Sequence, residues 1–316
     1  MKKNNIILFG AGYWGSKHLR VLSSLNTVDN IYVYDPSDGT TNDLKSQFPD
    51  AVFVDDYEKL LASKNVDGAI IATPPPTHFE LALKCLKNDL HVLVEKPIVE
   101  NLEQLESLHK ISSQKNLVLM SGHTFIFNNG IIKMKEIVDS GELGDIAYVI
   151  SDRLNFGIVR KDISLESNLA PHDLSILQFL FDNSSVEKIE KTGISFLSQH
   201  SYDYQTIKVD YDNNVKCIIN LSWYYPEKVR KIYIVGKKKM LVFDDSLQKK
   251  IKVYSNSIDS MDVSNIIEQG YYEPEISMEE ALMNEQKHFI SSFETPEKCK
   301  TGYKHNYNII KVLEHK

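Results

Sequence analysis

Short apolar runs alternate with amphipathic segments over the first 121 residues of the chain. Each apolar run has the length of a short buried strand, and the segments between the runs repeat their apolar positions with the period of a helix. The runs lie at 6–9, 31–34, 52–54, 69–72, 91–94 and 117–120, and the expected helices at 16–25, 42–48, 57–63, 79–87 and 102–114. This alternation predicts an α/β domain with a parallel, doubly wound sheet that ends near Ser121.

Beyond residue 121 the expected strands follow one another directly. After a helix at 129–140, β-rich segments lie at 147–152, 189–197, 202–211, 215–224, 229–235 and 240–244, whereas 171–181 and the tail from Met278 are typical of helices. Asp212-Asn213-Asn214 between two of these segments is a hairpin signal, because Asn and Asp tolerate positive φ. This half is therefore predicted to be α+β, with an open antiparallel or mixed sheet.

Length and pattern together predict two domains. A chain of 316 residues is long for a single hydrophobic core. We expect residues 1–121 to form the first domain and residues 122–316 the second, with the helices of 278–316 returning to brace the first. In that tail the side chains of Leu282, His288, Phe289 and Phe293 share one side of the expected helices.

The first apolar run ends in a glycine motif. Gly10, Gly12 and Gly15 have the spacing G-x-G-x-x-G between an expected strand and an expected helix. In that setting the first glycine permits the turn, the second lets the backbone approach a pyrophosphate, and the third lets helix and strand pack closely. The N–H groups at the helix start suit the phosphates. The motif predicts a Rossmann dinucleotide-binding domain, with Tyr13 and Trp14 beside the glycines as further cofactor contacts.

An acidic residue follows the second apolar run. Asp35 stands twenty residues beyond Gly15, where a carboxylate accepts hydrogen bonds from the adenine ribose and repels a 2′-phosphate. No Arg or Lys follows closely in 36–41 to attract that phosphate. The sequence therefore predicts NAD rather than NADP as the cofactor. The alternative is that Asp35 only opens a turn before Pro36.

Composition argues against several other classes of protein. A net charge of −7 makes non-specific binding of nucleic acid an unfavoured function. Three widely spaced cysteines, an odd number, predict reduced thiols in a cytoplasmic protein. The ten histidines form no metal-binding spacing and no apolar stretch is long enough to span a bilayer, so neither a metal nor a membrane is expected.

Ligands of doubly wound sheets bind at the carboxyl ends of the strands. Two of the expected strand ends carry side chains that could take part in catalysis or binding. The loop 73–78, Thr-Pro-Pro-Pro-Thr-His, is stiff enough to line a nicotinamide pocket, although a rigid connection to the next helix is the plainer interpretation. At the next strand end a buried Lys96 must pair or lose its proton. Glu95 is a candidate ion-pair partner, so Lys96 is either a functional amine or part of a structural pair. Pro97 after it invites a cis peptide bond.

A third candidate lies in the second half of the chain. The stretch 168–177, Asn-Leu-Ala-Pro-His-Asp-Leu-Ser-Ile-Leu, predicts a helix with Pro171 in its first turn. There Asp173 suits the positive end of the helix dipole, and His172 has a lowered tendency to hold a proton, which suits a general base. A lone histidine is more often structural, so both interpretations of His172 stay open.

Taken together, these residues resemble the Gfo/Idh/MocA family of sugar oxidoreductases over nearly the whole chain. The resemblance rests on the glycine motif, on Glu95-Lys96-Pro97, and on RLNFGIVRKD at 153–162 followed by LAPHDLSI at 169–176. The last two segments are similar to a bacterial branch near the UDP-N-acetylglucosamine and UDP-N-acetylglucosaminuronate 3-dehydrogenases of surface-polysaccharide synthesis.

The resemblance implies an NAD-dependent oxidoreductase acting at C3 of a UDP-N-acetylhexosamine or its uronate. Lys96 would position the reacting hydroxyl or carbonyl, and His172 would move its proton. The second domain would bind the substrate and pack against another subunit in a homodimer or homotetramer. The implied cofactor contacts beyond the glycine motif are Ala72, Thr73, Pro74, His78, Glu95 and Lys96, and the implied substrate contacts are Lys96, Arg153, Asn155, Arg160 and His172.

One position departs from the family. Where the family usually has Asp four residues before the catalytic His, often after Trp, this chain has Asn168 after Ser167. Asn keeps a hydrogen bond but cannot stabilise a cation as a carboxylate does, and Asn168 could instead be a helix cap. Three alternatives stay open: an NADPH-dependent sugar 3-ketoreductase, a dehydrogenase of a free sugar or inositol, and a non-catalytic NAD-binding protein.

Overall fold

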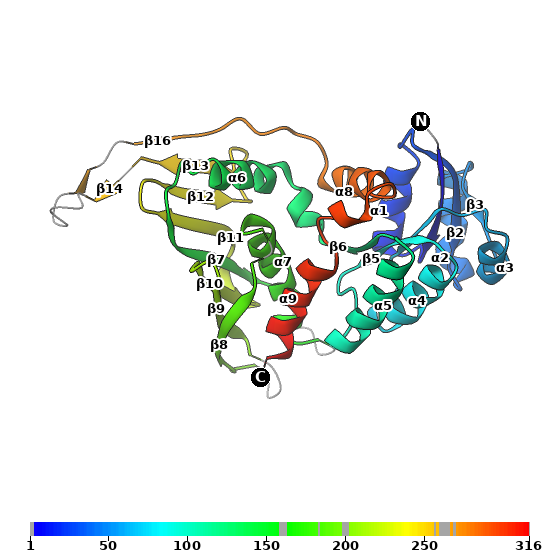
Figure 1. Ribbon diagram of the computed structural model, residues 1–316, viewed down its shortest axis with the longest axis horizontal. Coiled ribbons are helices and arrows are strands. Elements are labelled where there is room, and N and C mark those ends of the chain that lie inside the picture. The colour runs from blue at the N-terminus through cyan, green and yellow to red at the C-terminus, as the bar shows by residue number, and fades with distance from the viewer. Residues whose placement is uncertain are drawn as a thin grey trace. The chain divides into compact units, whose positions relative to one another are not determined.

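The computed structural model describes residues 3–157, 163–182, 184–197, 202–255, 257–258, 266–267 and 270–315 (Figure 1). Proximity of Cα atoms divides the chain into two compact units. The first unit is Met1–Phe127 with Glu279–Ile310, and the second is Asn128–Met278 with Lys311–Lys316. Each unit is built around its own sheet.

The first unit contains a six-stranded parallel sheet, which confirms the predicted fold class. The strands are β1 (Asn4–Phe9), β2 (Val28–Tyr34), β3 (Val52–Phe53), β4 (Gly68–Ile71), β5 (His91–Glu95) and β6 (Leu119–Gly122). Their order is β3-β2-β1-β4-β5-β6, so the direction of winding reverses between β1 and β4. In such sheets ligands bind at the carboxyl ends of the strands beside the reversal.

Helices cover this sheet because its strands are apolar on both faces. Ile6, Ile7, Leu8 and Phe9 of β1 are all 0% exposed, as expected of a central parallel strand. The helices are α1 (Tyr13–Leu22), α2 (Asp38–Gln47), α3 (Tyr57–Ala62), α4 (His78–Lys87), α5 (Leu102–Gln114), α8 (Ala281–Ser291) and α9 (Tyr303–Glu314), with short 3-10 turns η1 (Pro75–Thr77), η2 (Thr124–Phe127) and η3 (Pro296–Lys298). Helix α9 begins in the first unit and ends in the second.

The second unit contains an eight-stranded mixed sheet, also as predicted. Its strands are β7 (Ile146–Phe156), β8 (Val186–Ile194), β9 (Tyr204–Tyr211), β10 (Lys216–Ser222), β11 (Tyr224–Gly236), β12 (Met240–Asp244), β13 (Ile251–Tyr254) and β16 (Tyr271–Tyr272), and a separate ribbon pairs β14 (Ser257–Ile258) with β15 (Ile266–Ile267). The order is β16-β13-β12-β11-β7-β10-β9-β8, with β7 parallel to β10. The predicted hairpin joins β9 to β10, and Asn214 there has a φ of 65°.

One face of the second sheet carries helices α6 (Asn129–Asp139) and α7 (Leu165–Leu180) (Figure 1). Helix α7 packs on β7, β9 and β10. Along β7, Val149, Ser151 and Arg153 are buried, whereas Tyr148 is 43% exposed. Because side chains alternate between the faces of a strand, the odd-numbered positions of β7 face α7.

Helix α7 begins earlier than the sequence predicted. It spans Leu165–Leu180, with Ser164 as its N-cap and Pro171 inside it, so the predicted start at Pro171 is wrong. The Ser164 hydroxyl accepts from the Ser167 N–H at 3.1 Å, which satisfies an amide of the first turn. Proline is favoured in first turns, which misled the prediction. Inside α7, Pro171 leaves one helical hydrogen bond unmade, and burial of Leu165 and Leu174 in the core compensates for it.

The strands at the end of the second sheet were not predicted. Segments 251–254 and 271–272 form β13 and β16, which extend the sheet beyond β12. Ile251 and Val253 are buried while Lys252 lies between them on the other face, so β13 shows the alternation of a strand. Four residues give too short a pattern to distinguish a strand from a loop by periodicity alone.

Candidate functional site

The glycine turn between β1 and α1 is held by contact of backbone with backbone. Gly10 has a φ of 90°, and a Cβ there would lie 2.7 Å from the Ala72 carbonyl oxygen. A Cβ at Gly15 would lie 2.0 Å from the carbonyl oxygen of Gly10. Neither position has room for a side chain. The loops after β1 and β4 therefore lie against each other where the strand order reverses.

The start of α1 fits the pyrophosphate of a dinucleotide. Gly12 is the N-cap of α1, and no side chain caps the helix, so its first-turn amides can donate to a phosphate. A Cβ at Gly12 would meet no atom within 4 Å, so open space lies in front of this helix end. Gly12 and the amides after it would therefore hold the phosphates of NAD.

Tyr13 and Trp14 form an aromatic pair at the first turn of α1. Their side chains are 72% and 41% exposed, and their ring centroids lie 5.8 Å apart in an edge-on arrangement. The Lys17 ammonium lies 4.1 Å from the Tyr13 centroid and 4.8 Å from that of Trp14. Lys17 thus places a positive charge near the helix start, where it would add to the attraction of a phosphate.

Asp35 follows β2, and its carboxylate binds backbone amides from two loops. One oxygen accepts from the Ala11 N–H at 2.7 Å, and the other accepts from the Ser37 N–H at 2.8 Å. Asp35 therefore fixes the glycine turn through Ala11. Through Ser37 it also forms the turn at Pro36 that was the alternative interpretation of this residue. A carboxylate has about four acceptor positions, so both bonds leave capacity for ribose hydroxyls.

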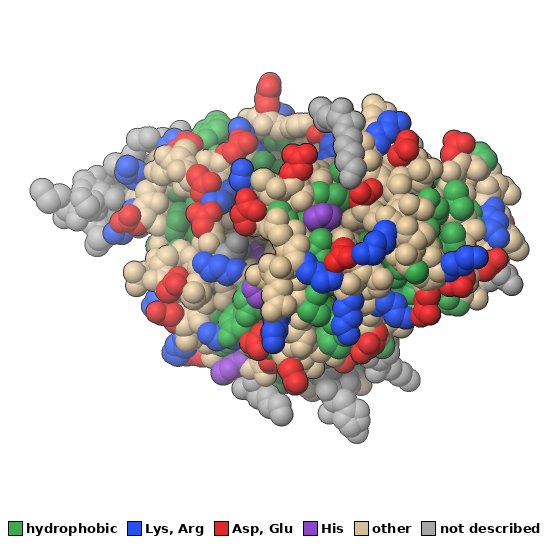
Figure 2. All heavy atoms as spheres, turned by 45° about the vertical axis from the view of Figure 1, so that its right-hand side comes forward, with side chains coloured by type: hydrophobic (Ala, Val, Ile, Leu, Met, Phe, Trp, Pro, Cys, Tyr) green, Lys and Arg blue, Asp and Glu red, His purple; other side chains and the backbone are tan. Residues whose placement is uncertain are grey.

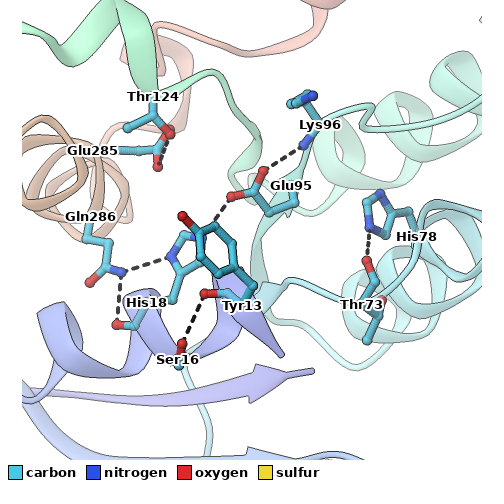
Figure 3. Close-up of polar contacts among 10 residues, drawn as sticks. All are labelled: Tyr13, Ser16, His18, Thr73, His78, Glu95, Lys96, Thr124, Glu285 and Gln286. Atoms are coloured by element: carbon cyan, nitrogen blue, oxygen red, sulfur yellow. Dashed lines mark hydrogen bonds and ion pairs between the residues drawn. The ribbon is translucent and has the colours of Figure 1, made fainter. Parts of the chain in front are cut away.

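The loop after β4 is rigid, and its histidine is buried beneath it. The Thr77 hydroxyl lies 2.7 Å from that of Thr73 and donates to the Pro74 carbonyl at 2.8 Å. His78 is 1% exposed; its Nε2 lies 2.8 Å from the Thr73 carbonyl oxygen, and its Nδ1 lies 2.8 Å from that of Pro97 (Figure 3). His78 thus braces the loops after β4 and β5, so any contribution it makes to cofactor binding is indirect.

Lys96 is half-buried at the end of β5, and Glu95 holds its backbone. Glu95 is 7% exposed; one carboxylate oxygen lies 3.1 Å from His18 Nε2, and the other accepts from the Lys96 N–H at 3.1 Å. In Figure 3 the Lys96 amine points away from this carboxylate. The Lys96–Pro97 peptide bond is cis, as predicted. Glu95 thus orients the turn from which the Lys96 side chain projects.

The tautomer of the His18 ring follows from its contacts with Gln286 of α8. The Gln286 amide nitrogen lies 3.1 Å from the His18 carbonyl oxygen and 2.9 Å from its Nδ1. A carbonyl oxygen can only accept, so the amide nitrogen faces His18 and donates to both atoms. Nδ1 is then an acceptor, and Nε2 carries the proton that is donated to Glu95. A chain of hydrogen bonds from α8 through α1 thereby fixes the strand end that carries Lys96 (Figure 3).

A second carboxyl group lies beside this chain. Glu285 is 0% exposed, and one of its oxygens accepts from the Thr124 hydroxyl at 3.2 Å. Burial, followed by the nearby charge of Glu95, raises the pKa of Glu285 well above its usual value. Burial also lowers the pKa of His123 to about 4. Both groups are thus favoured in their neutral forms.

In the second unit, Asn168 and His172 lie one turn apart on the same face of α7, and both are half-buried. Because α7 begins at Leu165, His172 lies about two turns from the helix start. The dipole argument for a lowered proton affinity of His172 is therefore wrong, since the effect is confined to the first turn. Ser164 is the cap, so the interpretation of Asn168 as a helix cap is also wrong.

Arg153 and Asp173 form a buried ion pair that ties β7 to α7. The Arg153 Nε lies 2.5 Å from one Asp173 oxygen, and its Nη2 lies 3.3 Å from the other, which also accepts from the Ser151 hydroxyl at 2.7 Å. Arg153 is 6% exposed and Asp173 is 2% exposed. The ion pair corrects the expectation that Asp173 serves the helix dipole. It gives Arg153 a structural role, while contact of Arg153 with the substrate stays a prediction.

The other two predicted substrate contacts lie along the same stretch. Asn155 is half-buried near the end of β7, on the face that Arg153 shares. Arg160 lies outside the residues that the structure describes.

Four residues of the site were not predicted: His18, Thr124, Glu285 and Gln286. In α8 the buried residues Leu282, Glu285, Gln286 and Phe289 recur at the helical spacing i, i+3, i+4, i+7, so two polar residues stand in an otherwise apolar stripe. Buried polar groups need hydrogen-bond partners, so this stripe was a usable signal of a network. It could not identify His18, which stands 268 positions away.

The described residues also include the cysteines and the charged side chains of the surface. The three cysteines are free thiols, and burial raises the pKa of Cys85 and that of Cys299 to about 12. Basic and acidic side chains intermingle on the face shown in Figure 2. Within the described ranges no three His, Cys, Asp or Glu side chains are grouped to hold a metal ion. A search of the same ranges finds no helix with the length and apolar character of a membrane span.

Two family models match the chain. The model described as "Oxidoreductase family, NAD-binding Rossmann fold" matches residues 4–123, and the model described as "GFO/IDH/MocA C-terminal domain" matches residues 131–242.

Curated relatives match over part of their length. The 2,7-anhydro-N-acetylneuraminate hydratase of Escherichia coli (strain K12) is 30% identical over 142 residues, 45% of this chain and 37% of that protein. The scyllo-inositol 2-dehydrogenase (NADP(+)) IolW of Bacillus subtilis (strain 168) is 27% identical over 128 residues, 40% of this chain and 36% of that protein. The chain therefore spans little more than a third of the length of either relative.

Solved structures share the fold over nearly the whole chain. UDP-N-acetylglucosamine 3-dehydrogenase GnnA from Acidithiobacillus ferrooxidans has a TM-score of 0.84 at 18% identity, covering 99% of this chain and 96% of that chain. GenD2 from gentamicin A biosynthesis, in complex with NAD, has a TM-score of 0.80 at 18% identity, covering 99% and 93%. A putative myo-inositol dehydrogenase from Sinorhizobium meliloti 1021 has a TM-score of 0.80 at 18% identity, covering 98% and 95%.

Two alanine substitutions separate the structural glycine from the ligand-facing one. Gly15→Ala is expected to lower the free energy of unfolding by about 1–3 kcal/mol, because its methyl group would meet the Gly10 backbone. Gly12→Ala is expected to leave that free energy within about 0.5 kcal/mol but to weaken NAD binding, because its methyl group fills the open space. Denaturant unfolding and calorimetric titration with NAD measure the two effects. Unchanged stability of Gly15→Ala or unchanged NAD affinity of Gly12→Ala would contradict this assignment.

Glu285 is expected to make stability depend on pH. Its folded-state pKa is raised, so its contribution to the free energy of unfolding is complete below the unfolded pKa, near 4.5, and is lost as pH rises toward the folded pKa. The loss is at most about 1.4 kcal/mol per pH unit. In denaturant unfolding between pH 5 and pH 8, the free energy of unfolding of Glu285→Gln should rise relative to that of the wild type as pH rises. Exposed Glu297→Gln is the control, and parallel profiles of Glu285→Gln and wild type would refute the raised pKa.

Proposed function

The chain belongs to the Gfo/Idh/MocA family of oxidoreductases, and on that premise we propose that it transfers a hydride between NAD and a hydroxyl-bearing carbon of a nucleotide-linked sugar. The first unit is an NAD-binding Rossmann domain, and family members act on hydroxyl groups. We place the reaction at C3 of a UDP-N-acetylhexosamine or its uronate. The segments at 153–162 and 169–176 support this choice, as does the fold shared with GnnA.

The observation that carries the proposal is the construction at the end of β5. Glu95, His18 and Gln286 fix the backbone of Lys96 by hydrogen bonds, while its amine points away from the Glu95 carboxylate. The strand end lies on the edge of the sheet where doubly wound folds bind their ligands. A positioned cation at such an edge suits an oxygen that gains negative charge during the reaction.

The proposed steps assign one role to each polar group. When bound, NAD supplies the hydride acceptor at its nicotinamide ring. The Lys96 ammonium donates a hydrogen bond to the reacting oxygen and stabilises charge that develops on it. His172 accepts the hydroxyl proton in oxidation and returns it in reduction. Asn168, one turn before His172, offers a neutral hydrogen bond in place of the usual carboxylate, so a cationic His172 gains less stabilisation.

Cofactor preference tests the role of Asp35. Wild-type protein is expected to bind NAD more tightly than NADP, because the carboxylate repels a 2′-phosphate. Asp35→Asn removes the charge and keeps one acceptor oxygen, so only one of the Ala11 and Ser37 amides keeps its partner. The ratio of the NADP dissociation constant to that of NAD should narrow about tenfold. Calorimetric titration with each dinucleotide measures that ratio. A wild type that prefers NADP would reject the assignment.

The reaction itself is tested by nicotinamide absorbance with a panel of UDP-N-acetylhexosamines, their uronates, free sugars and inositols. Lys96→Ala and His172→Asn are each expected to lower kcat about 100-fold or more, while the dissociation constant of NAD stays within about twofold. Lys87→Ala, an exposed lysine on α4, is the matched control. Full activity of Lys96→Ala would reject Lys96 as catalytic.

The same panel separates the alternatives. Turnover of inositol or free sugar without turnover of nucleotide sugars would reject nucleotide sugars as the substrate class and favour a dehydrogenase of a free sugar or inositol. NAD binding with no absorbance change across the panel would favour a non-catalytic protein, the alternative that Asn168 motivates.

A further inference from the structure

The α7 face of the second sheet carries a cation that the nearby acids do not neutralise. Arg230 of β11 stands directly opposite Arg153 of β7 in the antiparallel ladder. Side chains that stand opposite each other in a ladder project from the same face. Arg153 projects toward α7, where it binds Asp173. Arg230 therefore projects from the α7 face as well.

The two acids near Arg230 already have partners. Asp173 is bound by Arg153 through both oxygens, at 2.5 and 3.3 Å. Asp245, whose N–H donates to the Arg230 carbonyl at 3.0 Å, accepts from the Lys250 ammonium at 2.7 Å. No ion pair joins the Arg230 guanidinium to a carboxylate of the described residues. Counted over the described residues, the group of Arg153, Arg230, Lys250, Asp173 and Asp245 therefore carries one positive charge in excess.

The surroundings of Arg230 favour an anion. The side chain is half-buried, and burial, followed by the charge of Arg153, lowers its pKa. Arginine nonetheless stays charged in proteins, so two guanidinium groups repel each other in a partly desolvated place. An anion would relieve that repulsion. The planar fork of N–H donors on Arg230 matches the paired oxygens of a phosphate or a carboxylate.

We propose that Arg230 binds the anionic substituent of the substrate, either a pyrophosphate oxygen of a nucleotide sugar or the carboxylate of a uronate. The inference rests on the proposed function, because it names the residue that recognises the charged part of that substrate. It adds an arginine on the neighbouring strand to the predicted contact of Arg153, whose Nε and Nη2 bind Asp173. The Arg153–Asp173 pair supports the subsite by fixing β7 against α7.

Calorimetric titration of NAD-saturated protein tests the proposal with UDP, inorganic pyrophosphate and glucuronate, and with uridine and glucose as uncharged counterparts. Arg230→Gln should weaken binding of the anion that the wild type prefers by about 10- to 100-fold. Arg230→Lys keeps the charge but loses the paired donors, so its anion affinity should lie between those of the wild type and Arg230→Gln. Lys231→Gln is the matched control, because it removes the same charge from the next residue of β11, on the opposite face.

Several outcomes decide the question. Anion affinity that is equal in wild type and Arg230→Gln, or lost equally in Lys231→Gln, overturns the proposal. A wild type that binds none of the three anions overturns it too. Preference for UDP and pyrophosphate over glucuronate assigns the site to the pyrophosphate, and the reverse preference assigns it to the uronate. If Arg230→Gln has a lower melting temperature than the wild type, the comparison uses Arg230→Lys with an unchanged melting temperature. Anion affinity that is equal in Arg230→Lys and the wild type then overturns the inference.

The binding measurement does not require turnover, which keeps this inference separable from the proposed function. Anion binding that depends on Arg230, without hydride transfer to any nucleotide sugar, would sustain the subsite and reject the proposed reaction. Hydride transfer with a kcat/KM that Arg230→Gln leaves unchanged would sustain the reaction and reject the subsite.

Discussion

The first unit depends on one buried carboxylate, that of Glu95, whose two oxygens serve different elements. One oxygen binds the ring of His18 in α1, and the other accepts from the N–H of Lys96, the residue that follows β5. A charge in this position is tolerated only when each oxygen is bound, because desolvating an unpaired carboxylate is very unfavourable. The arrangement thereby joins a sheet edge, the helix that follows the glycine turn and α8. Any movement of that helix would be transmitted to Lys96.

In the second unit the Arg153–Asp173 pair has a comparable part. Buried ion pairs add little stability, because desolvation offsets most of the attraction, but they can select one arrangement of the elements that they join. Here the pair fixes the rotation of α7 about its own axis, since Asp173 must face β7. That rotation also sets the direction of Asn168 and His172, which share a different face of the same helix. A structural pair thus determines where two candidate polar groups point.

Much of the fold could be predicted because local periodicity carries it. Helix α5 spans Leu102–Gln114, the predicted range, and Asn101 caps it by accepting from the Gln104 N–H at 2.9 Å. The start of α7 could not be predicted in the same way. Ser164 and Pro171 both satisfy local rules for a helix start, and burial of Leu165 in the core decides between them.

The site was less predictable than the fold, because its polar partners come from distant parts of the chain. The glycine turn and Asp35 were accessible because their spacing encodes their geometry. Asp173 was assigned to a helix dipole because its actual partner, Arg153, belongs to another element. Such pairings between elements follow from tertiary packing, which periodicity alone does not describe.

The division of the chain has a consequence for its biosynthesis. All six strands of the first sheet lie before residue 127, but α8, which supplies Gln286, lies beyond the whole stretch 128–278. Domains generally begin to fold as they leave the ribosome, in order from the N-terminus. The nascent first sheet would therefore wait, with the His18 ring lacking one of its partners, until translation had passed through residues 128–278 of the second unit. Completion of the cofactor half is thus among the last events of synthesis, although its strands are among the first to be made.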